Sequence, residues 1–306
     1  MTTAVTLDKD GAIDARDWSL LAVLSVLWGG SFFFNGVIVR ELPPLTVVLL
    51  RVVLAALLLA PLLPLYRLRL PRSWPAWRPF FAIALLNNVL PFSLIVTGQT
   101  IVTSGLASIL NATTPLFTLA VMAIAGEERL NGRRAAGIVI GLIGVIILHG
   151  DALGFESRQS LGILLCLAAA ASYGLAALYA RRHLATSPPL ATATFQMMAS
   201  AVMMIPVAGV IEQPWRLPMP GATTWLAVIG LATLSTALAY LVFFQILRRS
   251  GATNVMLVTL LIPITALLLG SLALGEPIAA REIIGAAVIA SALLLIDGRV
   301  LALLRR

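Results

Sequence analysis

The sequence predicts an all-α integral membrane protein, on two observations. Of the 306 residues, 60% are hydrophobic and 11% are charged, whereas an average soluble domain is about 25% charged. A soluble protein of this size has too little interior to hide so much apolar surface. The apolar residues also form long unbroken runs, whereas the strands of a membrane barrel alternate apolar and polar residues. Together these features exclude an ordinary soluble enzyme, a secreted domain and a disordered chain.

The apolar runs divide the chain into ten candidate membrane spans. A helix needs about 20 apolar residues to cross a ~30 Å hydrocarbon core. The predicted spans are, in order, Trp18–Val39, Pro44–Leu65, Trp77–Thr97, Gly105–Ala125, Ala135–Leu148, Leu161–Ala180, Pro189–Ile211, Trp225–Leu247, Thr253–Leu274 and Ile283–Ile296. Three of them begin at tryptophans, which are typical of the membrane interface. The fifth and tenth spans are short, so we expect neighbouring loops to help fill the membrane there.

The basic residues predict the orientation of these spans. Sixteen of the 21 Lys and Arg residues lie in the loops and tails on one side, four lie on the other side, and Arg51 lies inside a span. Basic loops favour the cytoplasm, so both termini are expected there. Topology therefore accounts for the net charge of +8. The rival interpretation is a nucleic-acid-binding surface, but no nucleic-acid partner is expected.

The two halves of the sequence resemble one another when they are shifted by 145 or 148 residues. The aligned pairs include Trp28 with Tyr173, Gly29 with Gly174, Pro44 with Pro189, Arg51 with Gln196, Pro115 with Pro263, and Glu128 with Glu276. Each half holds five predicted spans, and because five is odd, the second half must enter the membrane inverted. Inverted repeats are typical of secondary transporters, which bind substrate near the membrane midplane between the repeats.

This pattern predicts five regions along the chain. They are a cytoplasmic tail over residues 1–17, a first repeat over 18–150, a linker over 151–160, a second repeat over 161–298, and a basic cytoplasmic tail over 299–306.

The motifs inside the spans resemble those of the drug/metabolite transporter superfamily, in its ten-helix branch with two EamA-type repeats. The resemblance covers about residues 18–298, and it rests on Leu27-Trp28-Gly29, Pro44, Arg51, Asn111-Ala112-Thr113-Thr114-Pro115, Gly126-Glu127-Glu128 and Gly275-Glu276-Pro277. Members of that family include exporters of amino acids, aromatic ones among them, and of other small metabolites. The resemblance implies a cell-membrane carrier whose central cavity is lined by spans one to four and six to nine, with spans five and ten at the periphery.

Polar and aromatic residues inside the apolar spans are the candidate substrate-binding residues. They are Trp28, Asn35, Arg51, Asn87, Asn88, Asn111, Thr114, Tyr173, Gln196, Tyr240 and Thr259. In the fourth span, polar residues from Ser104 to Thr118 recur at steps of three and four and so share one helix face. Such a face lines a watery cavity or bonds to a neighbouring helix. Asn111 is its strongest candidate, and Thr259 is the counterpart of Asn111 in the second repeat.

Two further pairs leave alternatives open. Trp28 and its counterpart Tyr173 form either aromatic walls around a partly apolar ligand or plain core packing. Asn87 and Asn88 are adjacent, so they cannot share one helix face and at most one of them is expected to reach the cavity.

Arg51 is the only formal charge well inside a predicted span. A charge there is costly unless it is paired, hydrated or able to reach the membrane surface. Arg51 therefore extends to the surface, bonds to backbone carbonyls, or attracts an anionic group such as the carboxylate of an amino acid. No acidic residue lies clearly at mid-membrane, which disfavours antiport of cationic drugs and weakens any expectation of proton or sodium coupling.

Proline and small residues suggest mechanical roles. Pro115 and Pro263 each fall ten residues into their predicted spans, where proline favours a kink. They act either as hinges for gating or as fixed kinks. The fifth and tenth spans carry small residues, which suit close helix packing or formation of a homodimer.

The expected function is that of a secondary carrier. We expect it to export small metabolites, above all amino acids including aromatic and hydrophobic ones, by alternating access through a central cavity. The alternatives are a carrier of other small organic anions or metabolites, and a lipid flippase. A membrane enzyme is disfavoured because no paired acids, histidine cluster or nucleophile–base set is apparent. The single cysteine and two histidines predict no metal site, and no cofactor is expected.

Overall fold

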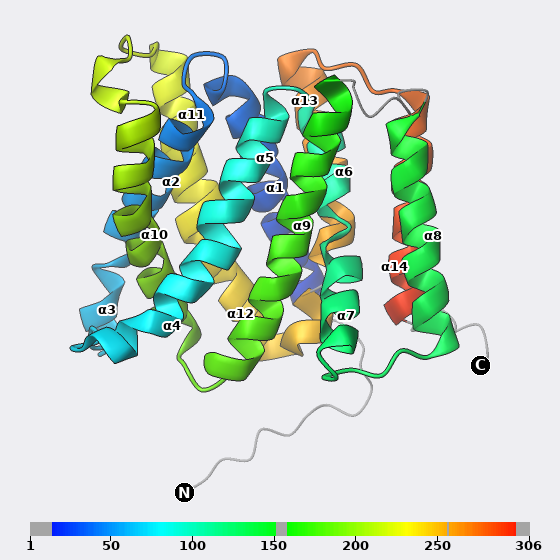
Figure 1. Ribbon diagram of the computed structural model, residues 1–306, viewed down its shortest axis with the longest axis horizontal. Helices are drawn as coiled ribbons and strands as arrows, with labels where there is room; N and C mark the ends of the chain where they lie inside the picture. Colours follow the sequence, from blue (N-terminus) through cyan, green and yellow to red (C-terminus); the bar gives the residue numbers. More distant parts are fainter. Residues whose placement is uncertain (1–13, 151–157, 256, 298–306) are drawn as a thin grey trace, which may run out of the picture.

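The computed structural model describes residues 14–150, 158–255 and 257–297, and these residues form helices and their connections with no strand. The helices run side by side between two ends of a bundle (Figure 1). Within the described residues, eight helical stretches are long and apolar enough to cross a membrane. The predicted all-α membrane protein is therefore confirmed at this level. The predicted tails, apart from residues 14–17, and residues 151–157 of the predicted linker lie outside the described residues.

The helices divide between the two halves of the chain. The first half contains α1 (Ala15–Ile38), α2 (Pro44–Leu59), α3 (Leu62–Leu65), α4 (Trp74–Ala84), the π-helix η1 (Leu85–Val89), α5 (Leu90–Gln99), α6 (Ser104–Asn111), α7 (Thr114–Ile124) and α8 (Gly132–His149). The second half contains α9 (Arg158–His183), α10 (Pro189–Ile211), the short 3₁₀-helix η2 (Pro214–Arg216), α11 (Ala222–Ala232), the π-helix η3 (Thr233–Leu238), α12 (Ala239–Val255), α13 (Val258–Leu274) and α14 (Ala280–Asp297).

Each predicted span overlaps a helix or a run of consecutive helices, but the fifth and tenth spans are longer in the structure than their predicted bounds. The predicted fifth and tenth spans correspond to α8 and α14, which have 18 residues each. The polar first turns of these helices, for example Arg133 and Arg134 in α8, hid their starts from a search for apolar runs. The described part of the ninth span, α13, has 17 residues.

Several spans are interrupted, and the sequence explains two of the breaks. The second span stops at Leu59 and resumes as α3 after Pro61. The fourth span breaks between α6 and α7, just before Pro115. Proline has no backbone N–H to donate to the carbonyl four residues earlier, and its ring clashes with that carbonyl. The carbonyl of Asn111 accepts a hydrogen bond from the Thr114 hydroxyl instead, at 2.7 Å.

Two glycines allow helices from different halves to approach closely in equivalent ways. A Cβ atom at Gly29 in α1 would lie 2.6 Å from Thr265 in α13, and one at Gly174 in α9 would lie 3.0 Å from the backbone of Phe117 in α7. The glycines are the aligned pair at the 145-residue shift, and Phe117 and Thr265 lie 148 residues apart. The same contact is therefore made twice, with the roles of the two halves exchanged.

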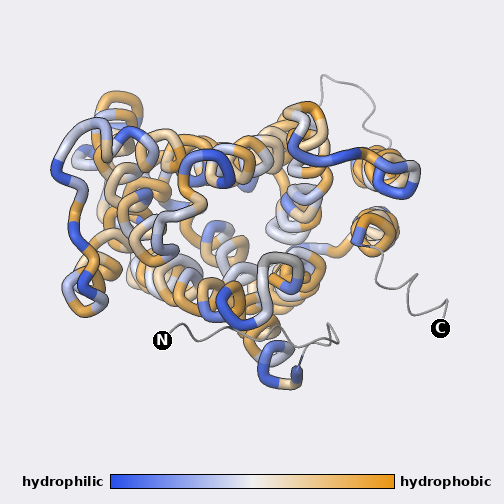
Figure 2. The backbone as a smooth tube through the Cα atoms, turned by 90° about the horizontal axis from the view of Figure 1, so that it is seen from below, coloured by the Kyte–Doolittle hydropathy of each residue, from blue (hydrophilic) through white to orange (hydrophobic). Residues whose placement is uncertain are grey.

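Helices α8 and α14 pack along one another at the edge of the bundle (Figures 1 and 2). Their glycines make this possible, because Cβ atoms at Gly137 and Gly144 would lie 2.4 Å from Ile296 and 2.7 Å from Ile289. The small residues of both helices thus serve close packing within this chain.

The basic end of the bundle is held by ion pairs between the halves of the chain. Arg182 at the end of α9 pairs with Glu127 after α7 at 2.8 Å. Arg249 in α12 pairs with Asp17 in α1 at 2.9 Å, and Ser250 also donates a hydrogen bond to Asp17. These contacts join the loop after α7 to the end of α9, and the start of α1 to α12, at the same end of the bundle (Figure 1). Figure 2 shows hydrophilic segments at such connections and hydrophobic colours along the helices.

Three glutamates hold the opposite end, and we call them the glutamate clasps. Glu212 after α10 accepts bonds from the backbone N–H groups of Leu45 and Thr46 in α2, at 2.9 and 2.6 Å. Glu276 after α13 accepts from the backbone N–H of Ser104 in α6 at 2.9 Å. Glu41 after α1 accepts from Gly221, before α11, at 2.7 Å. Each carboxylate accepts hydrogen bonds from backbone N–H groups at the start of a helix in the other half of the chain. These N–H groups have no partner within their own helix and favour a nearby negative charge.

Candidate functional site

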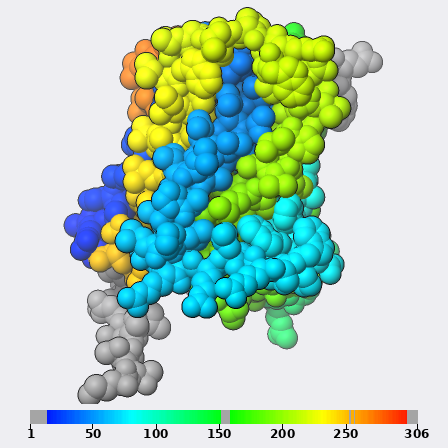
Figure 3. Space-filling view, turned by 90° about the vertical axis from the view of Figure 1, so that its left-hand side faces the viewer, coloured from blue at the N-terminus to red at the C-terminus, as the bar shows by residue number. Residues whose placement is uncertain are grey.

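Polar side chains from α2 and from four other helical segments lie near one another inside the bundle. This central polar cluster consists of Arg51 (α2), Asn87 (η1), Gln196 (α10), Thr236 (η3) and Tyr240 (α12). Figure 3 shows α2 lying between α10 and α11 on one face of the molecule. The cluster therefore joins helices of both halves of the chain.

Arg51 is buried, with 7% of its surface exposed. Its Nε donates a hydrogen bond to the Thr236 hydroxyl at 3.0 Å, and its guanidinium carbon lies 3.7 Å from the centre of the Phe92 ring. Within the described residues no carboxylate forms an ion pair with it. The hydroxyls of Tyr173 and Tyr240 are close enough to interact with its charge. Arg51 is thus a cation held by an aromatic face and neutral hydroxyls.

Gln196 connects Asn87 with Tyr240. Its Nε2 donates to the Tyr240 hydroxyl at 3.2 Å, and its Oε1 accepts from Asn87 at 3.4 Å. Asn88 is fully buried and instead donates to Ser200, one turn further along α10, at 3.0 Å. The two adjacent asparagines therefore reach different partners, and only Asn87 joins the cluster.

Both asparagines and Thr236 lie in π-helical turns. The turn η1 begins at residue 85 and η3 begins at residue 233, which is 148 residues later. A π-turn adds one residue to a helical turn and often occurs at functional sites. Thr236 also bonds the carbonyl of Leu231, five residues earlier, at 2.8 Å. From these turns, Asn87 and Asn88 bond to side chains of α10, and Thr236 bonds to Arg51 of α2.

A row of aromatic rings leads from the cluster to Trp28. The ring of Tyr240 stacks on Phe244 at 5.9 Å, Phe244 contacts Phe243 at 5.3 Å, and Phe243 contacts Trp28 at 5.4 Å between ring centres. Trp28 and Tyr173 are both half-buried. Tyr173 packs against the two largest apolar clusters of the bundle. The arrangement suits an aromatic wall and core packing alike.

Asn35 lies in a different network. Its Nδ2 donates to Gln99 at 2.9 Å, and Gln99 donates to the Phe32 carbonyl at 2.8 Å and to Ser104 at 3.3 Å. Ser104 in turn donates to Glu276 at 3.0 Å. Asn35 therefore belongs with a glutamate clasp at one end of the bundle, and the structure does not bring it to the central polar cluster.

The polar face predicted on the fourth span is split by the break before Pro115. The hydroxyls of Ser108, Thr114 and Thr118 donate to backbone carbonyls of their own span, at 2.7 to 2.9 Å. Asn111 is half-buried, and its Oδ1 is buried without a hydrogen-bond partner. Of this face, only Asn111 has a buried polar side-chain atom without any hydrogen-bond partner.

Thr259 and Pro263 line an apolar cavity of about 200 Å³ bounded by α6, α13 and α14. This cavity is lined mainly by leucine, isoleucine and alanine. Pro263 lies inside the continuous helix α13, whereas Pro115 lies at the first turn of α7. The two aligned prolines therefore have different local structures, and only Pro115 accompanies a break.

Some residues around these sites were missed by sequence analysis. Phe92 is one aromatic residue in an apolar run, and no pattern marks it as the neighbour of Arg51. Gln99 lies two residues beyond the predicted end of its span, although a polar residue at the true helix end was a usable signal. Glu282 was placed outside the tenth span, yet it is buried with 4% of its surface exposed.

Comparison with known proteins identifies relatives over most of the chain. A 26% identical relative, an uncharacterized transporter (YoaV) of Bacillus subtilis, aligns over 88% of this chain and 93% of its own. A probable amino-acid metabolite efflux pump of Escherichia coli is 27% identical over 91% of this chain and 93% of its own. An uncharacterized inner membrane transporter (YedA) of Escherichia coli is 28% identical over 90% and 89%.

A solved crystal structure of another protein shares the fold. It superposes with a TM-score of 0.64, covering 90% of this chain and 96% of the other, at 20% identity. The sequence model of the EamA-like transporter family matches twice, over residues 17–149 and 160–297. The relatives from Bacillus subtilis and Escherichia coli are named as transporters or as a probable efflux pump. The protein is a multi-pass membrane transporter, and the chain belongs to the EamA-like transporter family.

Proposed function

We propose that this protein is a secondary carrier that exports small carboxylated metabolites, amino acids first among them, and that the central polar cluster binds the substrate. The observation that carries the proposal is Arg51, a buried cation with a neutral hydroxyl and an aromatic ring as its partners. A guanidinium offers five N–H donors in a geometry that matches a carboxylate. Substrate would supply the missing negative charge.

Chemistry around Arg51 favours an amino acid over a simple anion. Gln196, Asn87 and Tyr240 present neutral donors and acceptors beside it, and the aromatic row from Tyr240 to Trp28 offers an apolar surface. A substrate with a carboxylate at one end and an apolar side chain fits both. The proposed contacts also include Tyr173, whereas Asn35, Asn88 and Thr259 are assigned to structural networks or to another cavity. Asn111 and Thr114 remain proposed contacts at the break between α6 and α7.

The proposal includes ten spans in two inverted five-helix repeats, with both termini in the cytoplasm. The paired glycine contacts, the two π-turns 148 residues apart and the two family matches support the repeats. The basic end of the bundle supports the orientation. Alternating access would move the repeats against one another, with the break at Pro115 as one hinge and Pro263 as a second point of bending.

Counterflow in liposomes tests the substrate class. Purified protein is reconstituted, and labelled amino acids, their amides and small organic anions are compared. We expect flux of amino acids, with poor competition by amides that lack the carboxylate. The variant Arg51→Gln should lose about tenfold to a hundredfold in affinity for carboxylates, since a hydrogen bond to a charged group contributes about 1.5–3 kcal/mol. Its affinity for the amides should change little.

Arg40→Gln is the matched control, because it removes an exposed arginine near the start of the same helix. Unchanged carboxylate affinity in a folded Arg51→Gln protein would assign Arg51 to structure. An absence of flux for every compound, in liposomes where the protein is folded and inserted, would refute the carrier itself. Movement of labelled lipid under those conditions would favour the flippase alternative.

A further inference from the structure

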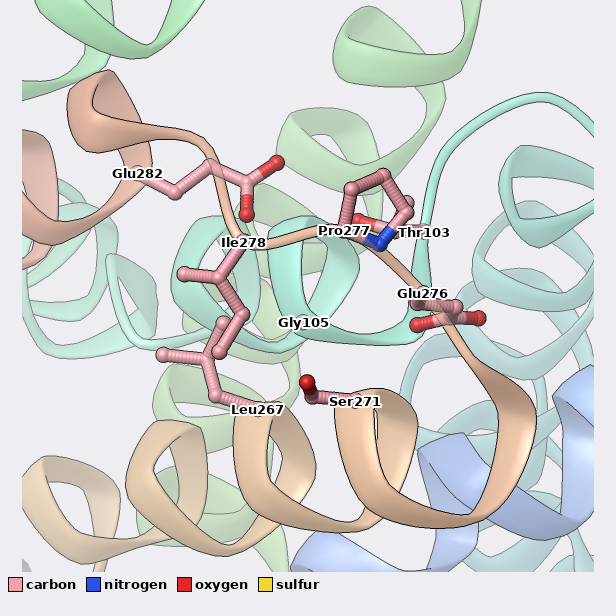
Figure 4. A pocket seen from close by; sticks show the side chains of 8 residues that line it. All are labelled: Thr103, Gly105, Leu267, Ser271, Glu276, Pro277, Ile278 and Glu282. Atoms are coloured by element: carbon pink, nitrogen blue, oxygen red, sulfur yellow. The ribbon is translucent and has the colours of Figure 1, made fainter.

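A second polar site lies outside the central polar cluster, where α6, α13 and α14 meet. Its polar residues are Thr103, Ser271, Glu276 and Glu282, which we call the acidic pocket (Figure 4). Glu276 follows α13, Glu282 lies in the first turn of α14, and Thr103 caps the start of α6. Three helices therefore contribute polar groups to one small space.

Glu282 is the unusual member of this pocket. It is 4% exposed, and its Oε2 is buried without a hydrogen-bond partner. Its carboxyl group bonds to the backbone of Ala279 and lies near the charges of Glu276 and Arg281. No ion pair joins it to a basic side chain within the described residues. An ionised carboxylate in such a place would carry a large desolvation cost.

Glu276 and Glu282 line the same pocket, so two negative charges there would also repel each other. The third nearby charge is Arg281, which lies over the end of α8 next to Gly150. From α8, the titratable group at this end is His149, which shares a hydrogen bond with Ser160 at 3.1 Å. One proton shared within the acidic pocket would remove both the repulsion and the unpaired charge.

Size distinguishes a proton from a metal ion as the ligand. The space among the side chains is too small to accommodate a water molecule. A sodium ion, which needs several oxygen ligands around it, would require the pocket to widen. Among the described residues no group of three or more His, Cys, Asp or Glu is placed to hold a metal ion. A proton needs no additional volume.

We propose that the acidic pocket is a proton-binding site, in which Glu282 takes up a proton from water and becomes a neutral carboxylic acid beside Glu276. The site is linked to helix packing, because Glu276 also clasps the backbone N–H and hydroxyl of Ser104 at the start of α6. Transfer of the proton to Glu276 would weaken that clasp, since a neutral carboxyl is a poorer acceptor than a carboxylate. The location of the proton, on Glu282 or on Glu276, would thereby set how firmly α6 is tied to α13.

Infrared difference spectroscopy during a pH titration tests the site directly. With wild-type protein in lipid nanodiscs, we expect the carbonyl band of one protonated carboxylic acid to persist at neutral pH. Glu282→Gln should remove that band. Glu128→Gln is the matched control, because it removes a more exposed glutamate, paired with Arg134, at the opposite end, and it should leave the band in place. Exchange of potassium for sodium should leave the titration unchanged.

Absence of the band in wild-type protein, or its persistence in Glu282→Gln, would overturn the proposal. A titration displaced by sodium would show a sodium site instead and would also overturn it. Thermal unfolding guards against a variant that merely misfolds: Glu282→Gln mimics the neutral acid and should be at least as stable as wild type at neutral pH. Lower stability of Glu282→Gln than of wild type at every pH would mean that the charge of Glu282 is structural.

A transport assay then asks whether the proton is used, and this step rests on the proposed carrier function. Glu282→Gln should keep counterflow of a labelled amino acid and lose its stimulation by a pH gradient. Wild-type counterflow without any response to a pH gradient would overturn coupling while leaving the carrier intact. The loss of all flux in wild type would instead refute the carrier, and the infrared result would stand on its own.

Discussion

Arg51 stands out among the buried residues because its neighbours stabilise it only in part. A cation over an aromatic ring gains about 2 kcal/mol or more when water is excluded, and Phe92 supplies that contact. The Thr236 hydroxyl accepts a hydrogen bond from the Nε–H of Arg51, and the other N–H groups of the guanidinium remain available to a ligand. A purely structural arginine would be expected to use its donors on carboxylates or several carbonyls. The incomplete satisfaction of Arg51 is what makes it a candidate for binding a carboxylate.

Glu127 at the basic end gives a prediction about acid. A hydrogen bond from Arg182 holds the pKa of Glu127 below its usual range. A carboxyl whose pKa is lower in the folded state stabilises the fold above its unfolded pKa of about 4.3, and this stabilisation is lost as pH falls through the folded pKa. Glu127→Gln should therefore lower the midpoint of thermal unfolding at neutral pH, and the difference from wild type should shrink in acid.

The partner residue supplies the control for this prediction. Arg182→Gln should show the same narrowing difference, and the double variant Glu127→Gln with Arg182→Gln should destabilise by less than the sum of the two single changes. Additive effects, or a difference that stays constant with pH, would mean that the ion pair does not hold the two segments together.

At the residue level, sequence analysis identified most of the central polar cluster but not its neighbours. Arg51, Asn87, Gln196 and Tyr240 are recognisable because polar groups are rare in apolar spans. Their contacts depend on how helices from distant parts of the chain approach, so Phe92 could not be chosen from among the apolar residues. Asn35 and Thr259 have the same polar character, yet they lie elsewhere. Polarity selects candidates, and only packing assigns them to a site.

At the level of helices, interruptions place the polar groups. The break before Pro115 could be predicted, because proline removes a donor and clashes with the preceding turn. The π-turns η1 and η3 could not, since neither LLNNV nor TLSTAL contains a residue that excludes an α-helix as proline does. Such turns depend on tertiary contacts that repay the irregular hydrogen bonding.

Close helix contacts at glycine give a second prediction. Gly174→Ala should lower stability by about 1–3 kcal/mol, the usual cost of overpacking, because the added Cβ would meet the backbone of Phe117 at 3.0 Å. A rigid backbone cannot move aside as a side chain can. The change should appear as a lower unfolding midpoint of the purified protein.

Gly132→Ala is the matched control, since a Cβ there meets nothing within 4 Å and the residue begins a helix. It should be neutral or slightly stabilising, because alanine favours a helix more than glycine does. If Gly174→Ala and Gly132→Ala changed the unfolding midpoint equally, the contact between α9 and α7 would be loose enough to accommodate an added methyl group.

For the whole molecule, composition was enough to predict the membrane class, and the internal shifts predicted which helices correspond. The shifts aligned Gly29 with Gly174 without indicating what either touches, and their equivalent contacts emerge only in three dimensions. Length was predicted less well: α8 and α14 extend into charged first turns that hydropathy alone excludes. Apolar runs therefore locate a span better than they locate its ends.

Orientation of the whole molecule can be tested with single cysteines. The native Cys166 is fully buried, so it should not react with a membrane-impermeant maleimide. In intact cells, Met219→Cys between α10 and α11 should be labelled, and Thr186→Cys between α9 and α10 should be labelled only after the membrane is opened. Both sites are exposed. The reverse pattern would place the basic end outside the cytoplasm.

The glutamate clasps have a consequence for the order in which this protein can mature. The first turns of α2 and α6 receive their carboxylates from residues 212 and 276, which a ribosome adds long after those helices have been made. Until then, the nascent first half must leave these N–H groups to water or lipid headgroups. Completion of the chain, rather than insertion of each helix, is the event that locks this end of the bundle, so a newly made first half waits in the membrane for the second.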